Sequence, residues 1–296
     1  MVLKQSYVGR FAPTPSGPLH FGSIIAALAS FLDARSQHGQ WLLRIDDLDK
    51  PRVNQAATDS IIRTLERLGM EWDGAISYQS KRLDEYQDVL DKMIKNDLVF
   101  RCYCPRRITR GIAYPGTCRQ AGIKAKERFS IRIITDNTPV CCHDLIQGEI
   151  QRNIQDQSGD FILLRSDKIF SYDFATAIDD SSEGITHVIR GADLLDSTPK
   201  QLYLQSLLEL SSPIYGHVPI AVNRTGKKIS KRTGAVDALL NKQPQRLLTE
   251  VLHFLGQDVD MSLANSEPRT VISWALENWD FKRVPGQESI TAPDAH

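Results

Sequence analysis

The sequence RFAPTPSGPLHFGS at residues 10–23 joins a short strand to a helix through a loop rich in Pro and Gly. Residues 7–11 are typical of a strand, the Pro and Gly cluster ends it, and an apolar run at helical spacing begins at Ser23. A helix N-terminus offers unpaired N–H groups and a positive partial charge, and both favour phosphate. His20 adds a donor beside Gly22, where the backbone can approach a ligand closely. The stretch predicts a phosphate site, although such turns are also common as plain structure.

A second stretch, TGKKISKRTG at residues 225–234, places four cations between two glycines. A mobile loop of this composition can close over anionic groups, whereas a run of charge by itself commonly marks a solvated surface. Together the two stretches resemble the HIGH and KMSKS signatures of class I aminoacyl-tRNA synthetases, here His20-Phe21-Gly22-Ser23 and Lys228-Ile229-Ser230-Lys231-Arg232. The resemblance implies that ATP, bound with Mg²⁺, activates a carboxylate. The implied ATP-binding residues are His20, Gly22, Ser23, Lys228, Ser230 and Lys231, and the implied catalytic residues are His20, Lys231 and Lys228.

Two further motifs narrow the resemblance to the glutamyl and glutaminyl branch of that class. The branch has the opening Arg10-Phe11-Ala12-Pro13 and a strand end of the form Arg-Ile-Glu/Asp-Asp-x-Asp, here RIDDLD at residues 44–49. Ser23 replaces the second His of the class signature, as is common in the branch. Because only residues 235–296 follow the basic loop, the chain most resembles the truncated paralogue family, the glutamyl-queuosine tRNA(Asp) synthetases.

This resemblance implies an ATP-dependent glutamyl ligase whose partners are glutamate, ATP and tRNA(Asp) carrying queuosine. Glutamate would be activated as glutamyl-adenylate and transferred to the queuosine base in the anticodon. Two alternatives stay open: a short glutamyl-tRNA synthetase that charges the tRNA 3′ end, and a non-catalytic paralogue that binds tRNA or an amino acid. The intact phosphate-binding groups of both motifs favour an enzyme, because an adaptor has no physical need of them.

Glutamate carries two carboxylates and one ammonium, so its pocket should offer two cationic contacts and one carboxylate. Arg10 lies at the end of the strand expected over residues 7–11, and Arg190 ends a later predicted strand. The guanidinium group of Arg forms bidentate pairs with carboxylates. Asp46 suits the ammonium, although the family often has Glu there, and Tyr172 can add a phenol hydrogen bond. The resemblance implies these glutamate-binding residues: Arg10, Phe11, Ala12, Pro13, Thr14, Asp46, Tyr172 and Arg190. Nearby, Asp193 could serve the ribose or cap the helix that begins at Leu194.

Three cysteines lie in an irregular segment that is otherwise poor in Cys. Cys102 and Cys104 can bind one metal ion, and Cys118 supplies a third thiolate suited to tetrahedral zinc. Coordination chemistry alone would take the fourth ligand from Cys141, Cys142 or His143. The family resemblance instead favours Tyr114, because Cys-x-Cys followed by Tyr, three residues and Cys is the pattern found there. The predicted metal set, for a structural zinc, is Cys102, Cys104, Tyr114 and Cys118.

Strands and helices alternate along the chain, which favours an α/β fold with a parallel sheet. We expect a Rossmann-type catalytic domain in residues 1–97 and 127–234, a zinc-binding insertion in 98–126, and a short helical region with a tail in 235–296. Residues 82–95 are expected to form a helix with Leu83, Tyr86, Leu90 and Ile94 facing inward, and residues 217–222 a strand.

Composition agrees with a soluble enzyme. The 296 residues are 41% hydrophobic and 24% charged, and no apolar stretch or signal sequence predicts membrane insertion or export. We therefore expect a cytoplasmic protein without a membrane partner, and a monomer. Lys plus Arg equals Asp plus Glu at 36 each, so RNA contacts must come from local patches. The candidates for RNA contacts are Arg106, Arg107, Arg110, Arg119, Lys242 and Arg246.

Overall fold

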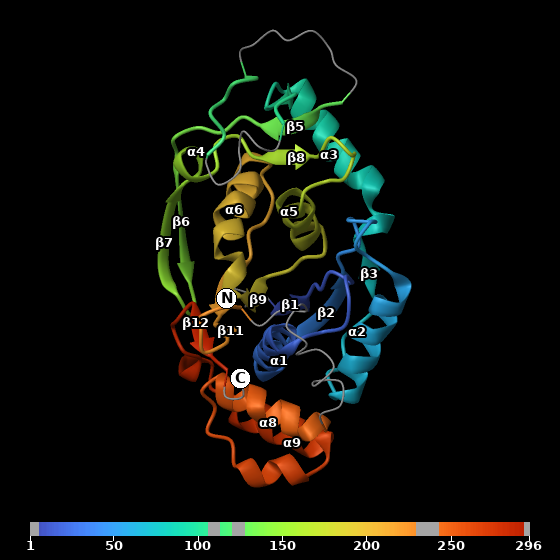
Figure 1. Ribbon diagram of the computed structural model, residues 1–296, viewed down its shortest axis with the longest axis vertical. Coiled ribbons are helices and arrows are strands. Elements are labelled where there is room, and N and C mark those ends of the chain that lie inside the picture. The colour runs from blue at the N-terminus through green and yellow to red at the C-terminus, as the bar shows by residue number, and fades with distance from the viewer. Residues whose placement is uncertain (1–5, 106–112, 120–127, 229–242, 293–296) are drawn as a thin grey trace, which may run out of the picture.

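A parallel sheet forms the centre of the computed structural model, which describes residues 6–105, 113–119, 128–228 and 243–292 (Figure 1). Strands β1 (Val8–Phe11), β2 (Gln40–Ile45) and β3 (Ser77–Tyr78) pair in parallel, and so do β9 (His187–Gly191) and β10 (Ile214–Val218). Thr186 joins the two groups, because its N–H donates to the Val8 carbonyl at 2.9 Å and its hydroxyl accepts from the Val8 N–H at 2.8 Å. The predicted α/β class with a parallel sheet is confirmed.

The carboxyl ends of these strands meet at one edge of the sheet. Arg10 lies near the end of β1, Asp46 directly follows β2, and Arg190 lies near the end of β9. In open parallel sheets this edge is where ligands bind. Three predicted pocket residues that are far apart in the sequence therefore share one edge.

Helix α1 (Phe21–Ser36) packs against β1 and β9 and is buried on most sides. It begins two residues before the expected Ser23, because His20 takes the N-cap position. Helix α2 (Gln55–Arg67) begins after the cap residue Asn54, and Gly69, with φ of +74°, follows its end. Near the C-terminus, α8 (Pro244–Phe254) and α9 (Pro268–Asn278) lie against α1 (Figure 1).

A second core lies toward the opposite end of the molecule from α8 and α9 (Figure 1). Strands β4 (Val99–Cys102), β5 (Ser130–Ile133) and β8 (Ile162–Leu164) form an antiparallel sheet there. Helices α3 (Leu83–Lys95), α5 (Tyr172–Ser182) and α6 (Thr198–Leu207) pack into the same core. The hairpin of β6 (Pro139–Asp144) and β7 (Gly148–Asn153) precedes α4 (Ile154–Gln157) and contacts α6 and β10.

Shorter elements complete the described chain. These are the 3-10 helices η1 (Gln79–Lys81), η3 (Ala192–Ser197), η5 (Met261–Asn265) and η6 (Phe281–Arg283), and the parallel strands β11 (Ile220–Val222) and β12 (Ser289–Thr291). Among the helices described, none is both long enough and apolar enough to cross a membrane.

Two local expectations are wrong in detail. The strand expected over residues 217–222 is divided into β10 and β11 at Pro219, which has no N–H for a strand pair. In α3 the buried residues are Tyr86, Leu90 and Met93, whereas Leu83 and Ile94 are exposed. The buried face of α3 therefore follows the spacing 86, 90, 93, and the two outer apolar residues lie beyond its edge.

Candidate active site

The N-terminus of α1 is built by His20 and the residues that follow it. The Ser23 N–H donates to His20 Nδ1 at 3.3 Å, so a neutral His20 ring carries its proton on Nε2. A Cβ at Gly22 would lie only 3.3 Å from two atoms of the His20 ring, so Gly at this position lets the ring lie close to the first turn. The first motif thus combines an imidazole N–H with a helix N-terminus, as the sequence predicts.

The loop after β1 is attached to the end of β2. The Asp46 N–H donates to the Pro13 carbonyl at 3.0 Å, and the Asn54 N–H donates to the Pro15 carbonyl at 3.3 Å. These bonds hold the predicted glutamate-binding segment 11–14 beside Asp46. Within it, Ala12 is half-buried, Pro13 is buried and Thr14 is exposed, whereas the ring of Phe11 is buried and stacks near Trp41 in the core.

Arg10 is buried, and its charge is already paired inside the protein. Its Nε and Nη2 donate to the two carboxylate oxygens of Asp180 on α5, at 3.2 and 3.0 Å. Arg44 donates to the same carboxylate at 2.8 Å, and to Glu183 at 2.8 Å. Burial would raise the pKa of Asp180, but Arg10 and Arg44 outweigh it and lower that pKa to about 2. The substrate-facing Arg predicted from sequence is therefore also an internal ion-pair partner.

Sequence reasoning did not select Asp179, Asp180 and Glu183, and it used Arg44 only as part of the RIDDLD motif. These four residues form the charged layer behind Arg10. The signal for the two Asp residues lies in α5, where two adjacent carboxylates follow the run FATAI at residues 174–178, and the helix is buried on nearly every side. Carboxylates at such positions need cationic partners from another element. Which Arg supplies the charge depends on the tertiary fold.

Asp46 has one paired and one unpaired carboxylate oxygen. Its Oδ1 accepts from Arg44 Nε at 2.9 Å, whereas its buried Oδ2 has no hydrogen-bond partner among the described residues. Burial raises the pKa of Asp46 to about 7, and Arg44 acts in the opposite direction. Arg10 also lies near enough to lower that pKa. An unpaired buried acceptor of this kind suits a cationic donor.

Arg190 is buried and connects several elements around the same edge of the sheet. Its Nη1 donates to the hydroxyl of Tyr172 at 3.3 Å and its Nη2 to the hydroxyl of Thr198 at 2.8 Å. Its Nε donates to Nε2 of His217 at 3.0 Å. The structure therefore places Tyr172 and Arg190, two predicted glutamate-binding residues, in contact with each other, and adds His217, which sequence reasoning did not select.

Of the basic loop, Lys228 is described, and its Nζ lies 2.6 Å from Asp193 Oδ2. Both side chains are partly exposed. The expectation that Asp193 caps a helix beginning at Leu194 is wrong, because η3 begins at Ala192 with Gly191 as its N-cap and has no side-chain cap hydrogen bond. Asp193 lies within the first turn of η3, and its carboxylate accepts from the Lys228 ammonium. The predicted Ser230 and Lys231 lie outside the described residues, as do the RNA candidates Arg106, Arg107, Arg110 and Lys242.

The Cys cluster lies at the end of β4. The Sγ atoms of Cys102, Cys104 and Cys118 all lie within 4.8 Å of one another. The Tyr114 hydroxyl lies 3.4 Å from the Cys102 sulfur and 3.7 Å from that of Cys104, which brings all four predicted ligands together. The alternative ligands lie elsewhere, on β6, where Cys141 is exposed and Cys142 half-buried, and His143 bonds Glu149 at 2.6 Å.

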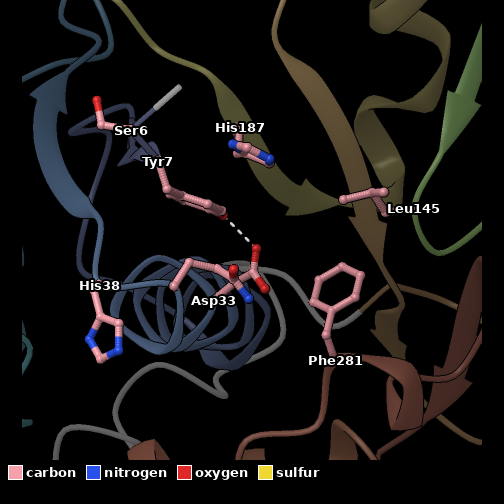
Figure 2. Close-up of a pocket in the computed structure, with 8 residues that line it drawn as sticks. Ser6, Tyr7, Asp33, His38, Leu145, His187 and Phe281 are labelled. Atoms are coloured by element: carbon pink, nitrogen blue, oxygen red, sulfur yellow. Dashed lines mark hydrogen bonds between the residues drawn. The ribbon is translucent and has the colours of Figure 1, made fainter. Parts of the chain in front are cut away.

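A separate pocket of about 400 Å³ lies at the amino ends of the parallel strands (Figure 2). Tyr7 precedes β1 and stacks on His187, the first residue of β9, with ring centroids 4.0 Å apart. The Tyr7 hydroxyl donates to Asp33 Oδ2 at 2.5 Å, and Phe281 lines the same pocket. None of the predicted site residues lines this pocket, so it is distinct from the candidate site at the opposite edge.

Comparison with known proteins assigns a class to this fold and site. The family described as tRNA synthetases class I (E and Q), catalytic domain, matches residues 7–111 and 115–254. A glutamate tRNA ligase from Elizabethkingia meningosepticum, solved in complex with its amino acid, superposes with a TM-score of 0.80 at 24% identity, over 98% of this chain and 68% of the ligase. At that identity the likeness concerns the fold. The chain thus has the catalytic fold of a class I tRNA synthetase.

Curated relatives narrow the assignment further. A glutamyl-Q tRNA(Asp) synthetase from Dechloromonas aromatica is 42% identical over 98% of this chain and 100% of its own length. A protein of the same name from Pseudomonas aeruginosa is 45% identical over 96% of this chain and 97% of its own length. The chain belongs to the glutamyl-Q tRNA(Asp) synthetase family, within class I.

Proposed function

We propose that this enzyme activates glutamate with ATP as glutamyl-adenylate and transfers the glutamyl group to queuosine in the anticodon of tRNA(Asp). Relatives that are 42 and 45% identical over nearly the whole chain bear the corresponding name. The structural observation that supports the amino-acid part is the buried Oδ2 of Asp46, which has no hydrogen-bond partner in the described part of the chain and lies close to Arg10. Arg190 lies near the end of β9, at the same edge of the sheet. The carboxylate of Asp46 can accept the ammonium of glutamate, and the guanidinium groups of Arg10 and Arg190 can bind the two carboxylates of glutamate.

In this site Asp46 would accept the ammonium of glutamate, while Arg10, Arg190 and Tyr172 would bind its carboxylates. An oxygen of the α-carboxylate then attacks the α-phosphorus of ATP, the bond from that phosphorus to the bridging oxygen breaks, and pyrophosphate leaves. The protein supplies alignment and charge stabilisation, because no covalent step on the enzyme is required. His20 and the α1 N-terminus suit the phosphates, and Lys231 suits the leaving group.

For Lys228 of the basic loop, residues 225–234, to bind the triphosphate of ATP, its contact with Asp193 has to break. Lys228 is paired with Asp193 at 2.6 Å, and both groups are accessible to water. An exposed ion pair has little net stability. Triphosphate could therefore replace Asp193 as the partner of Lys228 at small cost, and Asp193 would then be available to another hydrogen-bond donor such as the ribose.

The Cys cluster would hold a structural zinc ion. In a tetrahedral site with Zn–S bonds of about 2.3 Å the sulfurs lie about 3.8 Å apart, which the observed limit of 4.8 Å accommodates. Burial raises the pKa of Cys104 to about 11, whereas hydrogen bonds from the Tyr103 backbone and the Tyr114 hydroxyl lower the pKa of Cys118 to about 7 despite its burial. A bound cation would favour the thiolate of Cys104 as well. Four protein ligands leave no position for a reactive water, which makes the ion structural and not catalytic.

Recognition of the RNA would use cations that are free to reach phosphate, and the described candidates differ in this respect. Arg119 forms an ion pair with Asp160 and donates to the Thr135 carbonyl at 2.7 Å, so it is held against the protein. Arg246 is exposed on α8, so its guanidinium is accessible to a phosphate. We expect the enzyme to be cytoplasmic and to bind tRNA(Asp) as a monomer.

Pyrophosphate exchange tests the activation step without any RNA. We expect exchange into ATP that depends on glutamate and proceeds in the absence of tRNA, with aspartate and glutamine as poor substrates. A site built for carboxylates leaves charged groups unpaired when another side chain enters. Exchange that strictly requires tRNA, or that proceeds equally well with glutamine, would contradict this assignment.

A further inference from the structure

We propose that Asp144 and His217 are positioning residues that fix the guanidinium of Arg190 for a substrate carboxylate. The identity of that substrate rests on the function proposed above, but the geometry of the three side chains does not. Arg190 lies on β9, His217 on β10 and Asp144 at the end of β6. The fold thus brings together three strands from separate parts of the sequence to make this chain of contacts.

The chain of hydrogen bonds is continuous and buried. Asp144 Oδ2 lies 2.6 Å from His217 Nδ1, and His217 Nε2 lies 3.0 Å from Arg190 Nε. His217 has no exposed surface, and Asp144 and Arg190 are 1% and 4% exposed. Water therefore does not compete for these bonds, and each lost partner would leave a buried polar group unsatisfied.

These contacts determine the tautomer of His217. An Arg side chain can only donate, so His217 Nε2 must be the acceptor in its bond with Arg190. The proton of the neutral ring is then on Nδ1, from which it is donated to Asp144. Burial and the nearby Arg190 charge lower the pKa of His217 even though Asp144 raises it, which keeps the ring neutral.

Asp144 is itself held rigidly by the backbone. Its Oδ1 accepts from the N–H groups of Ile146 at 3.0 Å, Gln147 at 2.8 Å and His217 at 3.1 Å. The carboxylate therefore cannot rotate without breaking three further bonds. A fixed Asp144 fixes the His217 ring, and the ring fixes the plane of Arg190.

The result is a defined set of available donors on Arg190. Its Nε is used by His217, and its Nη2 donates to Thr198 at 2.8 Å and to the Leu194 carbonyl at 3.4 Å. Its Nη1 donates one hydrogen to the Tyr172 hydroxyl at 3.3 Å, and the second Nη1 hydrogen has no contact shown within the described residues. Because the Tyr172 oxygen accepts from Nη1, its own hydrogen can be donated outward. Two adjacent donors then match the two oxygens of one carboxylate.

The test compares two substitutions at His217 in glutamate-dependent pyrophosphate exchange. His217→Leu removes the acceptor, so we expect the KM for glutamate to rise about ten-fold or more, with the KM for ATP changed less than about two-fold. His217→Gln can place its amide oxygen near the position of Nε2, and we expect it to recover most of the loss. His143→Ala, on the exposed face of the same hairpin as Asp144, is the matched control and should resemble the wild type.

Thermal unfolding identifies variants that do not fold. A second measurement uses the wild-type protein and does not depend on any variant being stable. Nitrogen-15 NMR spectra of the histidine rings should show His217 protonated at Nδ1 and unprotonated at Nε2. The signals of His217 are assigned by their absence from the spectrum of His217→Gln. A proton on Nε2, or a folded His217→Leu variant with an unchanged KM for glutamate or an equal rise in the KM for ATP, would overturn the positioning role. Absence of exchange in the wild type would instead contradict the proposed function, while the nitrogen spectra would still test the geometry.

Discussion

Arg10 and Asp180 form a bidentate ion pair, in which Arg10 Nε and Nη2 lie 3.2 and 3.0 Å from the two oxygens of Asp180. The pair joins the central sheet to helix α5, since Arg10 belongs to β1 and Asp180 to α5. It also orients Arg10, whose Nη1 is the end of the guanidinium not used in the pair. One edge of the Arg10 guanidinium is thus used for contacts within the protein.

Replacement of Asp180 by Asn should therefore destabilise the fold. Removing one partner of a buried ion pair leaves a buried charge uncompensated, so we expect the free energy of unfolding to fall by about 3 kcal/mol or more in urea titrations. Asp167→Asn is a matched control, because Asp167 pairs with Arg165 at 2.5 Å on the surface and should cost less than about 1 kcal/mol. Equal losses in the two variants would contradict a special role for the Arg10 pair.

Asp46 should make glutamate binding dependent on pH. Burial raises the pKa of Asp46 to about 7, and the ionised form binds an ammonium. The KM for glutamate in pyrophosphate exchange should therefore fall as the pH rises from about 6 to about 8 and Asp46 loses its proton. Asp46→Asn should have a higher KM that does not vary with pH in this range. A wild-type KM that is constant across the range would rule out this assignment.

The raised pKa of Asp46 also affects stability, and here the effect of rising pH is unfavourable, whereas its effect on glutamate binding is favourable. The pKa of Asp46 in the folded protein lies above its ordinary value of 3.8, so the folded state binds this proton more tightly than the unfolded chain does. The contribution of Asp46 to the free energy of unfolding should decrease as the pH rises from about 4 to about 7. Subtracting the pH profile of Asp46→Asn from that of the wild type isolates this contribution.

Lys231→Ala should lower the rate of glutamate-dependent exchange by roughly a hundred- to a thousand-fold, the usual effect of removing one transition-state charge contact. Lys228→Ala should have a smaller effect, since Lys231 is the residue expected to contact the leaving group and Lys228 would only assist it. Glutamate affinity, measured by calorimetry, should be preserved in both variants. Near wild-type exchange by Lys231→Ala would show that the basic loop is only a surface loop.

Metal analysis should find about one zinc ion per chain. Cys102→Ser should lose the ion and lower the unfolding temperature, because binding and folding of such a site are coupled. Cys141→Ser is the control, since this thiol is exposed on β6 and lies apart from the cluster, and it should keep both zinc and stability. A stable, metal-free wild-type protein would contradict the zinc assignment.

The sequence predicted local features better than long-range partners. The strand-to-helix loop before α1 and the helix expected over residues 82–95 depend on neighbouring residues, and both are present. The pairing of Arg10 with Asp180 joins residues 170 positions apart, and the contact of Arg190 with His217 depends on strand register. Family motifs predicted which residues form the site, and that prediction stays open for Ser230 and Lys231, which lie outside the described residues. The carboxylates and the imidazole that contact Arg10 and Arg190 follow only from the fold.

The acceptor of the glutamyl group is tested most directly with two RNAs that differ in one base. An isolated anticodon stem-loop of tRNA(Asp) carrying queuosine is incubated with the enzyme, ATP and labelled glutamate, beside the same stem-loop carrying guanosine. We expect label on the queuosine stem-loop and none on the guanosine stem-loop, and the binding should weaken as salt rises. Glutamate found on the 3′-terminal adenosine of intact tRNA, with queuosine irrelevant to transfer, would contradict this function and favour a short glutamyl-tRNA synthetase.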